Sequence, residues 1–452
     1  MEETNVVSAM EAERFVEDLR SFDVESVGSK AFFEEHERLE KLNLQAHANA
    51  VANRDPFVME ALLTFGKMDT LVHELMAIEL WKEKVAPLLA DEMLQADSIR
   101  SYVLLYHEAT VSSLLECILF NKEALDAAED SLLDLVDWCQ RKIVRLVASK
   151  DMSPPKVGRE TAKDMLAQTA ADIQREQAAH IEFNVSLAAF TILRFITDHI
   201  ADLPLSVMTR VLNTHDLPSL LVNLVDRAPW LARSPAGMFK WIDGKWQKIQ
   251  GADLRKLCKV EAQAWLALNN LLCDGECRKK YQYGAHNQQT ILKLRNHFSD
   301  VLLDQIPPLA DLRRAIEEIQ LMAPPEATKV ETSLVIEQVP HIRDALMHRR
   351  DWKAIADAQR VSIFQISEDD RRAEMERMAA MYSLDAYADV MEQPNCAQCG
   401  IPAVKRCSRC KTDWYCGREC QVKAWKAHKP MCDMLCKAAA AAAAAAESGG
   451  SA

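Results

Sequence analysis

The cysteines of this 452-residue chain are concentrated near its C-terminal end. Eight of the 13 lie between Cys396 and Cys436, and the other five are spread over the residues before them. The chain opens on acidic residues with no apolar stretch of the kind that forms a secretory signal, so we expect a reducing compartment. In such a compartment, clustered cysteines bind metal more often than they form disulfides.

The spacing of the cluster predicts two zinc sites. From Cys396 the pattern is Cys-x2-Cys-x7-Cys-x2-Cys-x5-Cys-x3-Cys-x7-His-x3-Cys, which provides seven cysteines and one histidine. A structural zinc site takes four such ligands in a tetrahedron, so eight ligands complete two sites. Cys416 and Cys420, like His428 and Cys432, are four residues apart, which places each pair on one face of a helix. Spacing alone leaves open which pairs share an ion.

The order of six cysteines, one histidine and one cysteine resembles that of the MYND zinc finger. RING and PHD modules differ, because their histidine comes earlier. The neighbouring residues agree with the resemblance: Cys407-Ser408-Arg409-Cys410, Trp414-Tyr415-Cys416, Cys420-Gln421 and Trp425-Lys426-Ala427-His428. It implies two interleaved zinc sites, one formed by Cys396, Cys399, Cys416 and Cys420 and the other by Cys407, Cys410, His428 and Cys432. Cys436 is left as a free thiol.

The same resemblance implies a protein-binding module, often one for short proline-containing peptides. Ser408, Gln421 and Trp425 occupy the positions that line the peptide groove in relatives. Trp425 lies between helix ligands, so it could equally belong to the core of the finger. Both zinc sites would be closed, because four side chains fill each of them and leave no position for a catalytic water.

The charge of the cluster fits metal binding better than nucleic-acid binding. Residues 396–436 contain eight Lys or Arg against three Asp or Glu, while the whole chain has a formal net charge of −13. Seven thiolates and two zinc ions would leave the finger weakly positive, so its basic residues largely balance the thiolates. A nucleic-acid patch is the alternative interpretation of these residues, but the acidic chain as a whole disfavours it.

Residues 1–322 are predicted to form a mainly α, irregular armadillo-like body. Only 12 glycines and 16 prolines interrupt the chain, which favours long helices. Residues 71–78, 131–137 and 217–225 carry apolar residues at helical spacing. The first and third of these stretches resemble the last helix of an armadillo repeat, but no clean period is present, so an irregular helical domain is the alternative.

One segment of the body is predicted to be a small inserted β-hairpin. In residues 239–248, Asp243 and Gly244 lie between alternating apolar and polar residues, and a two-residue turn would pair Trp241 with Trp246. The hairpin is interpreted as a cover for part of the body or as a docking element for a partner.

The rest of the chain divides by composition. We expect a proline-containing loop at 153–158, a linker at 323–334, charged helices at 335–394, the MYND finger at 395–436 and an Ala-rich tail at 437–452 that is helical or disordered. Ser367 and Asp370 would cap one of the charged helices. We expect no membrane span, because Arg194 and Asp198 interrupt the most apolar stretch.

The body also resembles the MYND-containing factors required for cytoplasmic preassembly of axonemal dynein arms in motile cilia. The matching stretches are residues 36–43, 77–82, 212–218 and 302–307. The resemblance implies a non-enzymatic adaptor or co-chaperone in the cytoplasm, near the centrosome, the cilium base or the apical region. Its implied partners are a leucine-rich-repeat preassembly factor, cytosolic chaperones, and dynein heavy and intermediate chains as clients.

Enzymatic and nuclear functions find little support in the sequence. The chain has no Asn-His-x-Cys motif of a SET methyltransferase and no glycine-rich phosphate loop. His107-Glu108 lacks the second histidine of a metalloprotease, since residue 111 is Val111, and Cys273 and Cys277 have no matching pair and are expected to be reduced structural thiols. A nuclear MYND-type corepressor adaptor is the alternative function, but the basic runs at 348–350 and 371–372 are too short for a nuclear localisation signal.

Overall fold

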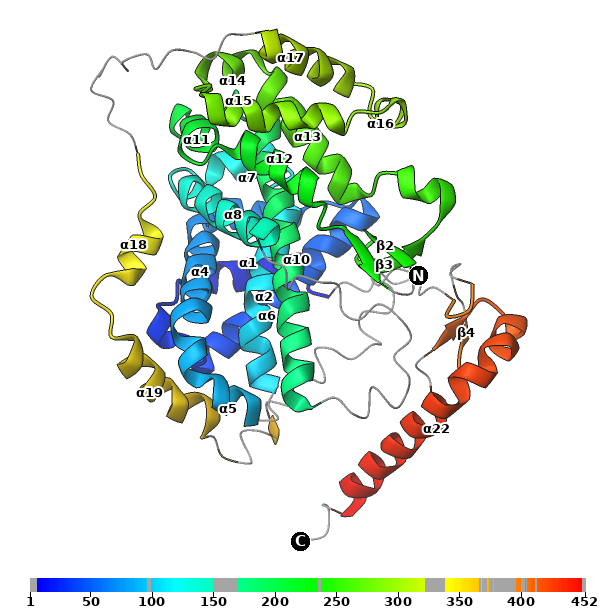
Figure 1. Cartoon of the computed structure of the whole chain (residues 1–452). Helices are drawn as coiled ribbons and strands as arrows, with labels where there is room; N and C mark the ends of the chain where they lie inside the picture. Colours follow the sequence, from blue (N-terminus) through cyan, green and yellow to red (C-terminus); the bar gives the residue numbers. More distant parts are fainter. Residues whose placement is uncertain are drawn as a thin grey trace. The chain divides into compact units, whose positions relative to one another are not determined.

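Helices form nearly all of the described body, and the predicted mainly α fold with a small sheet and a C-terminal finger is confirmed (Figure 1). The computed structural model describes residues 6–95, 99–148, 169–234, 237–321, 338–365, 367, 372–373, 377, 396–399, 403, 405–410 and 413–448. The chain divides into two compact units, a helical body within residues 5–158 and 170–375 and a C-terminal unit that contains residues 376–452.

The first part of the body is a series of helices joined by short turns. They are α1 (Ala9–Asp18), the 3-10 helix η1 (Val24–Ser26), α2 (Lys30–Ala52), α3 (Phe57–Thr64), α4 (Met68–Leu80), the π-helix η2 (Trp81–Val85), the 3-10 helix η3 (Ala86–Leu89), α5 (Ala90–Gln95), α6 (Ile99–Ile118), α7 (Lys122–Ala127) and α8 (Ser131–Ala148).

The second part of the body adds further helices and one small sheet. Its elements are α10 (Ala170–Asp198), α11 (Leu205–Thr209), the π-helix η4 (Arg210–Thr214), α12 (Leu217–Arg227), β1 (Leu231–Ser234), β2 (Gly237–Ile242), β3 (Lys245–Ile249), the 3-10 helix η5 (Gly251–Arg255), α13 (Lys259–Cys273), α14 (Gly275–Lys280), α15 (Ala285–Leu292), the 3-10 helix η6 (Lys293–Asn296), α16 (Asp300–Gln305), α17 (Leu309–Leu321), α18 (Ile342–Met347) and α19 (Trp352–Phe364).

The long helix α10 runs through the middle of the body, where it packs against α6, α8 and α13 (Figure 1). By length and composition, residues 171–198 of this helix would suffice to cross a membrane, but 67% of its apolar window is buried inside the body. Arg194 and Asp198, which interrupt the apolar stretch in the sequence, form an ion pair along the helix. Packing in the core accounts for the apolar character of α10.

Buried charges lie in the same core, and the hydrophobic pattern of the sequence did not predict them. The Glu108 carboxylate forms ion pairs with Lys82 Nζ at 2.8 Å and with Lys142 Nζ at 2.7 Å. It also accepts a hydrogen bond from Trp138 Nε1 at 3.1 Å. Burial opposes ionisation of Glu108, but the two ammonium groups keep the pKa of its carboxyl below the ordinary value. The charges are paired and hydrogen-bonded, as buried charges must be.

His107 extends this cluster with a chain of neutral groups. His107 Nε2 lies 2.9 Å from Glu74 Oε1, and His107 Nδ1 lies 3.0 Å from His36 Nδ1. Burial raises the pKa of Glu74 to about 8 and lowers the pKa of His107 to about 3, so carboxyl and imidazole are both uncharged at neutral pH. His107 and Glu108 are therefore part of the core packing of the body.

The hairpin predicted for residues 239–248 is confirmed. β2 and β3 pair antiparallel with Trp241 opposite Trp246, and both turn residues, Asp243 and Gly244, have positive φ as a type I′ turn requires. The sequence analysis missed β1, which pairs with the other edge of β2. The Trp241 ring lies edge-on to Phe183 of α10, with 5.1 Å between ring centroids, so the sheet is anchored on the body by aromatic contacts. Its interpretation as a cover or a docking element stays a prediction.

Helices α18 and α19, which fall within the predicted charged helices at 335–394, form a strap that packs on the body. α18 contacts α4, and α19 contacts η2 and η3, within one compact unit (Figure 1). The buried Asp134 carboxylate of α8 accepts the backbone N–H groups of His341 and Ile342, each at 3.1 Å, so a side chain of α8 caps the start of α18. Trp81 Nε1 donates to Gln359 Oε1 of α19 at 2.7 Å. These contacts give the charged segment a structural role in the body.

Other predictions are not tested by the described residues. The predicted loop at 153–158, the linker at 323–334 and Asp370 of the predicted helix cap lie outside them. The armadillo-like repeat and the division into domains also stay predictions.

Replacing Asp134 with alanine should destabilise the body, because the buried amides at the start of α18 would lose their acceptor. The expected loss in the free energy of unfolding is roughly 1–3 kcal/mol, measured by urea denaturation of the full chain. Asp126→Ala is the control, since Asp126 forms only an exposed ion pair with Lys122 and its loss should cost about 0.5 kcal/mol or less. Equal effects of the two substitutions would show that Asp134 does not hold the strap.

Candidate metal centre

The finger is built from two short strands and one long helix. β4 (Lys405–Arg406) and β5 (Trp414–Tyr415) pair antiparallel, and α22 (Arg418–Ser448) begins shortly after β5 and continues through the alanines of the tail. Two backbone hydrogen bonds tie the ligand loops to β5 and to the residue before it, from Ala397 N to Trp414 O at 2.9 Å and from Cys407 N to Asp413 O at 2.8 Å. These bonds hold the two Cys-x2-Cys turns beside β5.

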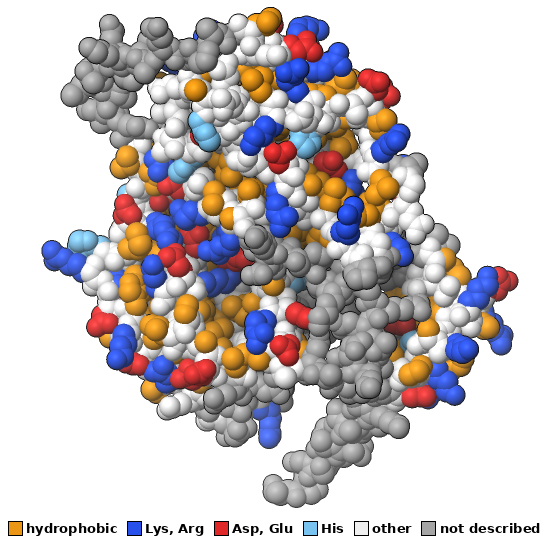
Figure 2. Space-filling model, in the orientation of Figure 1, with side chains coloured by type: hydrophobic (Ala, Val, Ile, Leu, Met, Phe, Trp, Pro, Cys, Tyr) orange, Lys and Arg blue, Asp and Glu red, His pale blue; other side chains and the backbone are white. Residues whose placement is uncertain are grey.

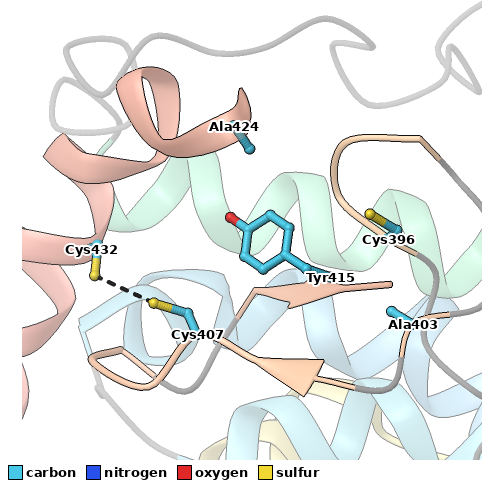
Figure 3. Packing of buried hydrophobic residues seen from close by; sticks show 6 residues of the cluster. All are labelled: Cys396, Ala403, Cys407, Tyr415, Ala424 and Cys432. Atoms are coloured by element: carbon cyan, nitrogen blue, oxygen red, sulfur yellow. Dashed lines mark hydrogen bonds between the residues drawn. The ribbon is translucent and has the colours of Figure 1, made fainter. Parts of the chain in front are cut away.

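The apolar core of the finger is very small. Among the described residues of the finger, Tyr415, Ala403 and Ala424 are buried apart from the ligands, with Trp414 and Trp425 packed against them, and the Tyr415 side chain lies between the strands and α22 (Figure 3). So few apolar residues cannot stabilise a fold on their own. The ligand side chains therefore carry most of the packing between the strands and the helix.

The first ligand quartet consists of Cys396, Cys399, Cys416 and Cys420, whose sulfur atoms all lie within 4.8 Å of one another. Cys416 Sγ lies 3.5 Å from Cys399 Sγ and 3.4 Å from Cys420 Sγ, and Cys420 Sγ lies 3.7 Å from Cys399 Sγ. Zinc–sulfur bonds of ~2.3 Å in a tetrahedron place neighbouring sulfurs about 3.8 Å apart. The quartet is thus close to the size of a zinc tetrahedron.

The second quartet consists of Cys407, Cys410, His428 and Cys432, also within 4.8 Å of one another. Cys407 Sγ lies 3.8 Å from Cys432 Sγ (Figure 3). Cys410 Sγ lies 3.6 Å from His428 Nε2. Three thiols and one imidazole are a common donor set for structural zinc. The structure therefore brings together the two interleaved quartets that the resemblance implied, and they fit two zinc ions.

The acidity of the thiols shows why the quartets suit a cation. Burial opposes ionisation of Cys396, but backbone hydrogen bonds, among them one from Cys416, lower its pKa to about 6, whereas hydrogen bonds with Cys420 and its neighbours raise the pKa of Cys416 to about 12. In the second quartet, burial again opposes ionisation of Cys407, yet backbone hydrogen bonds lower its pKa to about 6. Burial and the contact with Cys407 raise the pKa of Cys432 to about 12. Adjacent thiols cannot all ionise unless a positive charge lies between them.

Asp413 is a functional residue that the sequence analysis missed. Its Oδ2 lies 2.8 Å from His428 Nδ1, and Tyr415 Oη donates to the same oxygen at 3.3 Å. An acceptor at Nδ1 keeps the proton on that nitrogen and leaves the Nε2 lone pair directed at the quartet, as in carboxylate–histidine–zinc arrangements. The signal in the sequence was an aspartate before the Trp-Tyr-Cys of β5, but only the fold shows that it faces a histidine 15 positions later.

The three predicted groove residues lie on two neighbouring parts of the finger. Ser408 is exposed in the turn between Cys407 and Cys410, and Gln421 and Trp425 are half-buried one turn apart on α22. The Trp425 ring lies 5.9 Å from the His428 ring, and the Arg409 guanidinium lies over it at 5.9 Å from its centroid. Trp425 thus contacts the core and also reaches the surface. The peptide-binding role of these residues stays a prediction.

The cysteines outside the quartets have no metal partner among the described residues. Cys436 is a free thiol packed against the finger core. In the body, burial raises the pKa of Cys273 to about 11 and that of Cys277 to about 12, as is typical of unreactive thiols.

Residues 396–432 match the model of the MYND finger family. The chain contains a MYND finger. The chain is 29% identical to the Zinc finger MYND domain-containing protein 10 homolog of Drosophila melanogaster over 454 aligned residues. The alignment covers 95% of this chain and 99% of that protein. The predicted resemblance to this kind of MYND protein is therefore confirmed along nearly the whole chain.

Other relatives share much shorter segments. A SET and MYND domain-containing protein of Dictyostelium discoideum is 56% identical over 32 residues, which is 7% of this chain and 6% of that protein. Protein CBFA2T2 of Homo sapiens is 35% identical over 89 residues, or 18% of this chain and 14% of that protein. No solved structure matches the chain.

Replacing Asp413 with alanine should weaken zinc binding at the second quartet alone, because His428 would lose the acceptor that orients its ring. The expected loss of zinc affinity is about 10- to 100-fold, measured by competition with a chromophoric chelator. Asp433→Ala is the matched control, since Asp433 pairs with Arg409 on the surface. Zinc release that is the same in both variants would contradict the role given to Asp413.

Proposed function

We propose that this protein is a non-enzymatic cytoplasmic adaptor or co-chaperone for the assembly of axonemal dynein arms, and that motile cilia need it. The observation that carries the proposal is the similarity to the Drosophila melanogaster protein along nearly the full length of both chains. A shared finger alone would leave the choice among MYND proteins open, since the other matches cover a small share of each chain.

The finger supports a binding function. Each quartet is filled by four protein side chains, so a zinc ion held there would stabilise the fold and leave no ligand position for substrate. Exposed Ser408 and half-buried Trp425 lie on the same small unit and would offer polar and aromatic contacts to a peptide. The expected partners are a leucine-rich-repeat preassembly factor and cytosolic chaperones, with dynein heavy and intermediate chains as clients.

The location of the protein distinguishes this proposal from the nuclear corepressor alternative. In ciliated cells, the tagged full chain should accumulate in the cytoplasm, including the region near the cilium base. Steady enrichment in the nucleus would contradict the adaptor proposal.

Replacing Cys407 with alanine should disable the finger and leave the body intact, because the second quartet would lose one of its ligands while the body forms a separate compact unit. We expect loss of bound zinc, at least a ~10-fold drop in capture of dynein chains from ciliated cells, and unchanged urea unfolding of the body. Cys436→Ala is the control, because Cys436 is a neighbouring thiol outside both quartets. Unchanged capture by Cys407→Ala would show that the finger is not the docking site.

A further inference from the structure

The helix that supplies ligands to both zinc sites has a second, exposed face. Cys420, Ala424, His428 and Cys432 recur every four residues along α22 and form its inner side. Another set of residues falls on the opposite side at helical spacing and is exposed to solvent: Arg418, Val422, Lys423, Lys426 and Lys429. We call this set the basic face.

The cations of the basic face help to balance the thiolate charge of the finger, but among its described residues they have no carboxylate partner of their own. Within the described part of the finger, Arg418 and the three lysines form no ion pair. The acidic side chains nearby are mostly committed elsewhere, because Asp413 contacts His428 and Asp433 pairs with Arg409. Glu419, also exposed and four residues before Lys423, adds one negative charge to this side of α22. In Figure 2, Lys and Arg side chains gather on this unit with hydrophobic ones between them.

An apolar side chain lies in the middle of these charges. Val422 is 65% exposed, one helical turn from both Arg418 and Lys426. Trp425, three residues after Val422, is half-buried, and the Arg409 guanidinium lies over its ring. The basic face therefore places four cationic side chains around the aliphatic Val422, with part of the Trp425 ring beside it. This surface is complementary to a peptide segment in which carboxylates flank an apolar residue.

We propose that the basic face of α22 docks an acidic segment of a partner protein, with an apolar side chain of that segment placed over Val422. This inference rests on the proposed function of the finger as a protein-binding module and adds the charge of the partner. Carboxylates would approach Lys423, Lys426 and Lys429, whose long, exposed side chains can hold their charges in solvent. The partner would thus contact the side of α22 that the zinc ligands leave free.

A protein segment fits this face better than a nucleic acid does. The whole chain has a net charge of −13, so a long polyanion would be repelled outside the short basic face. The exposed Val422 at its centre offers no contact to a phosphate, whereas an aliphatic side chain would bury it.

The test uses the zinc-loaded full chain and a labelled peptide in which Asp and Glu flank a single Leu. We expect saturable binding that weakens as salt rises from about 50 to about 200 mM, and no binding of the same peptide with Lys in place of its acids. The double variant K423E/K426E should bind the acidic peptide at least ~10-fold more weakly, and Val422→Asp should also weaken it. Zinc content must stay at the wild-type level in both variants.

The control is K245E/K248E, which makes the same charge change at two exposed lysines of β3 and should bind the peptide like the wild type. The proposal is overturned if K423E/K426E binds as tightly as the wild type, or if a uridine oligonucleotide or phosphatidylserine vesicles bind more tightly than the peptide. Loss of dynein-chain capture in Cys407→Ala but not in K423E/K426E would leave the proposed function standing and reject the acidic segment as the partner.

Discussion

The bond between zinc and thiolate is the interaction on which the C-terminal unit depends. Seven cysteines and one histidine converge in two quartets, and the ligand atoms of each lie within 4.8 Å of one another. Close thiols resist joint ionisation, as the opposite pKa shifts of Cys396 and Cys416 show. A bound cation would remove that conflict and join β4, β5 and α22 at the same time. The interleaving matters, because each quartet takes ligands from an early turn and from a later part of the chain, so each zinc ion would join segments that are distant in the sequence.

In the helical body, the packing of the core depends on buried charges that are paired with one another. Glu108 is held between two lysines in the core, and a chain of neutral groups from Glu74 to His36 lies beside it. Buried pairs of this kind contribute little net stability, but the loss of one partner is costly. They therefore fix how α4, α6 and α8 pack. α8 also caps the strap through Asp134, so the segment that leads toward the finger is tied to the body by a polar contact.

Much of this arrangement could be predicted from the sequence, for reasons that differ between elements. The Asp243-Gly244 turn fixes the register of its hairpin locally, so the pairing of Trp241 with Trp246 was correct. The zinc quartets came from ligand order and a resemblance, because spacing does not determine topology. Asp413, the strand β1 and the cap on α18 depend on contacts between residues distant in sequence, and no local pattern marks them. In the sequence, Glu108 and Lys142 look like surface charges. They can be buried because they form an ion pair with each other, and this pairing is visible only in the folded structure.

We propose that the finger is a closed module that holds two zinc ions and leaves its surface for binding. The most direct test is X-ray absorption at the zinc edge on the full chain, combined with the zinc-to-protein ratio. We predict two zinc ions per chain, one bound by four sulfurs and the other by three sulfurs and one nitrogen, with no oxygen ligand on either. One zinc per chain, or a water or carboxylate oxygen bound to either ion, would contradict the account.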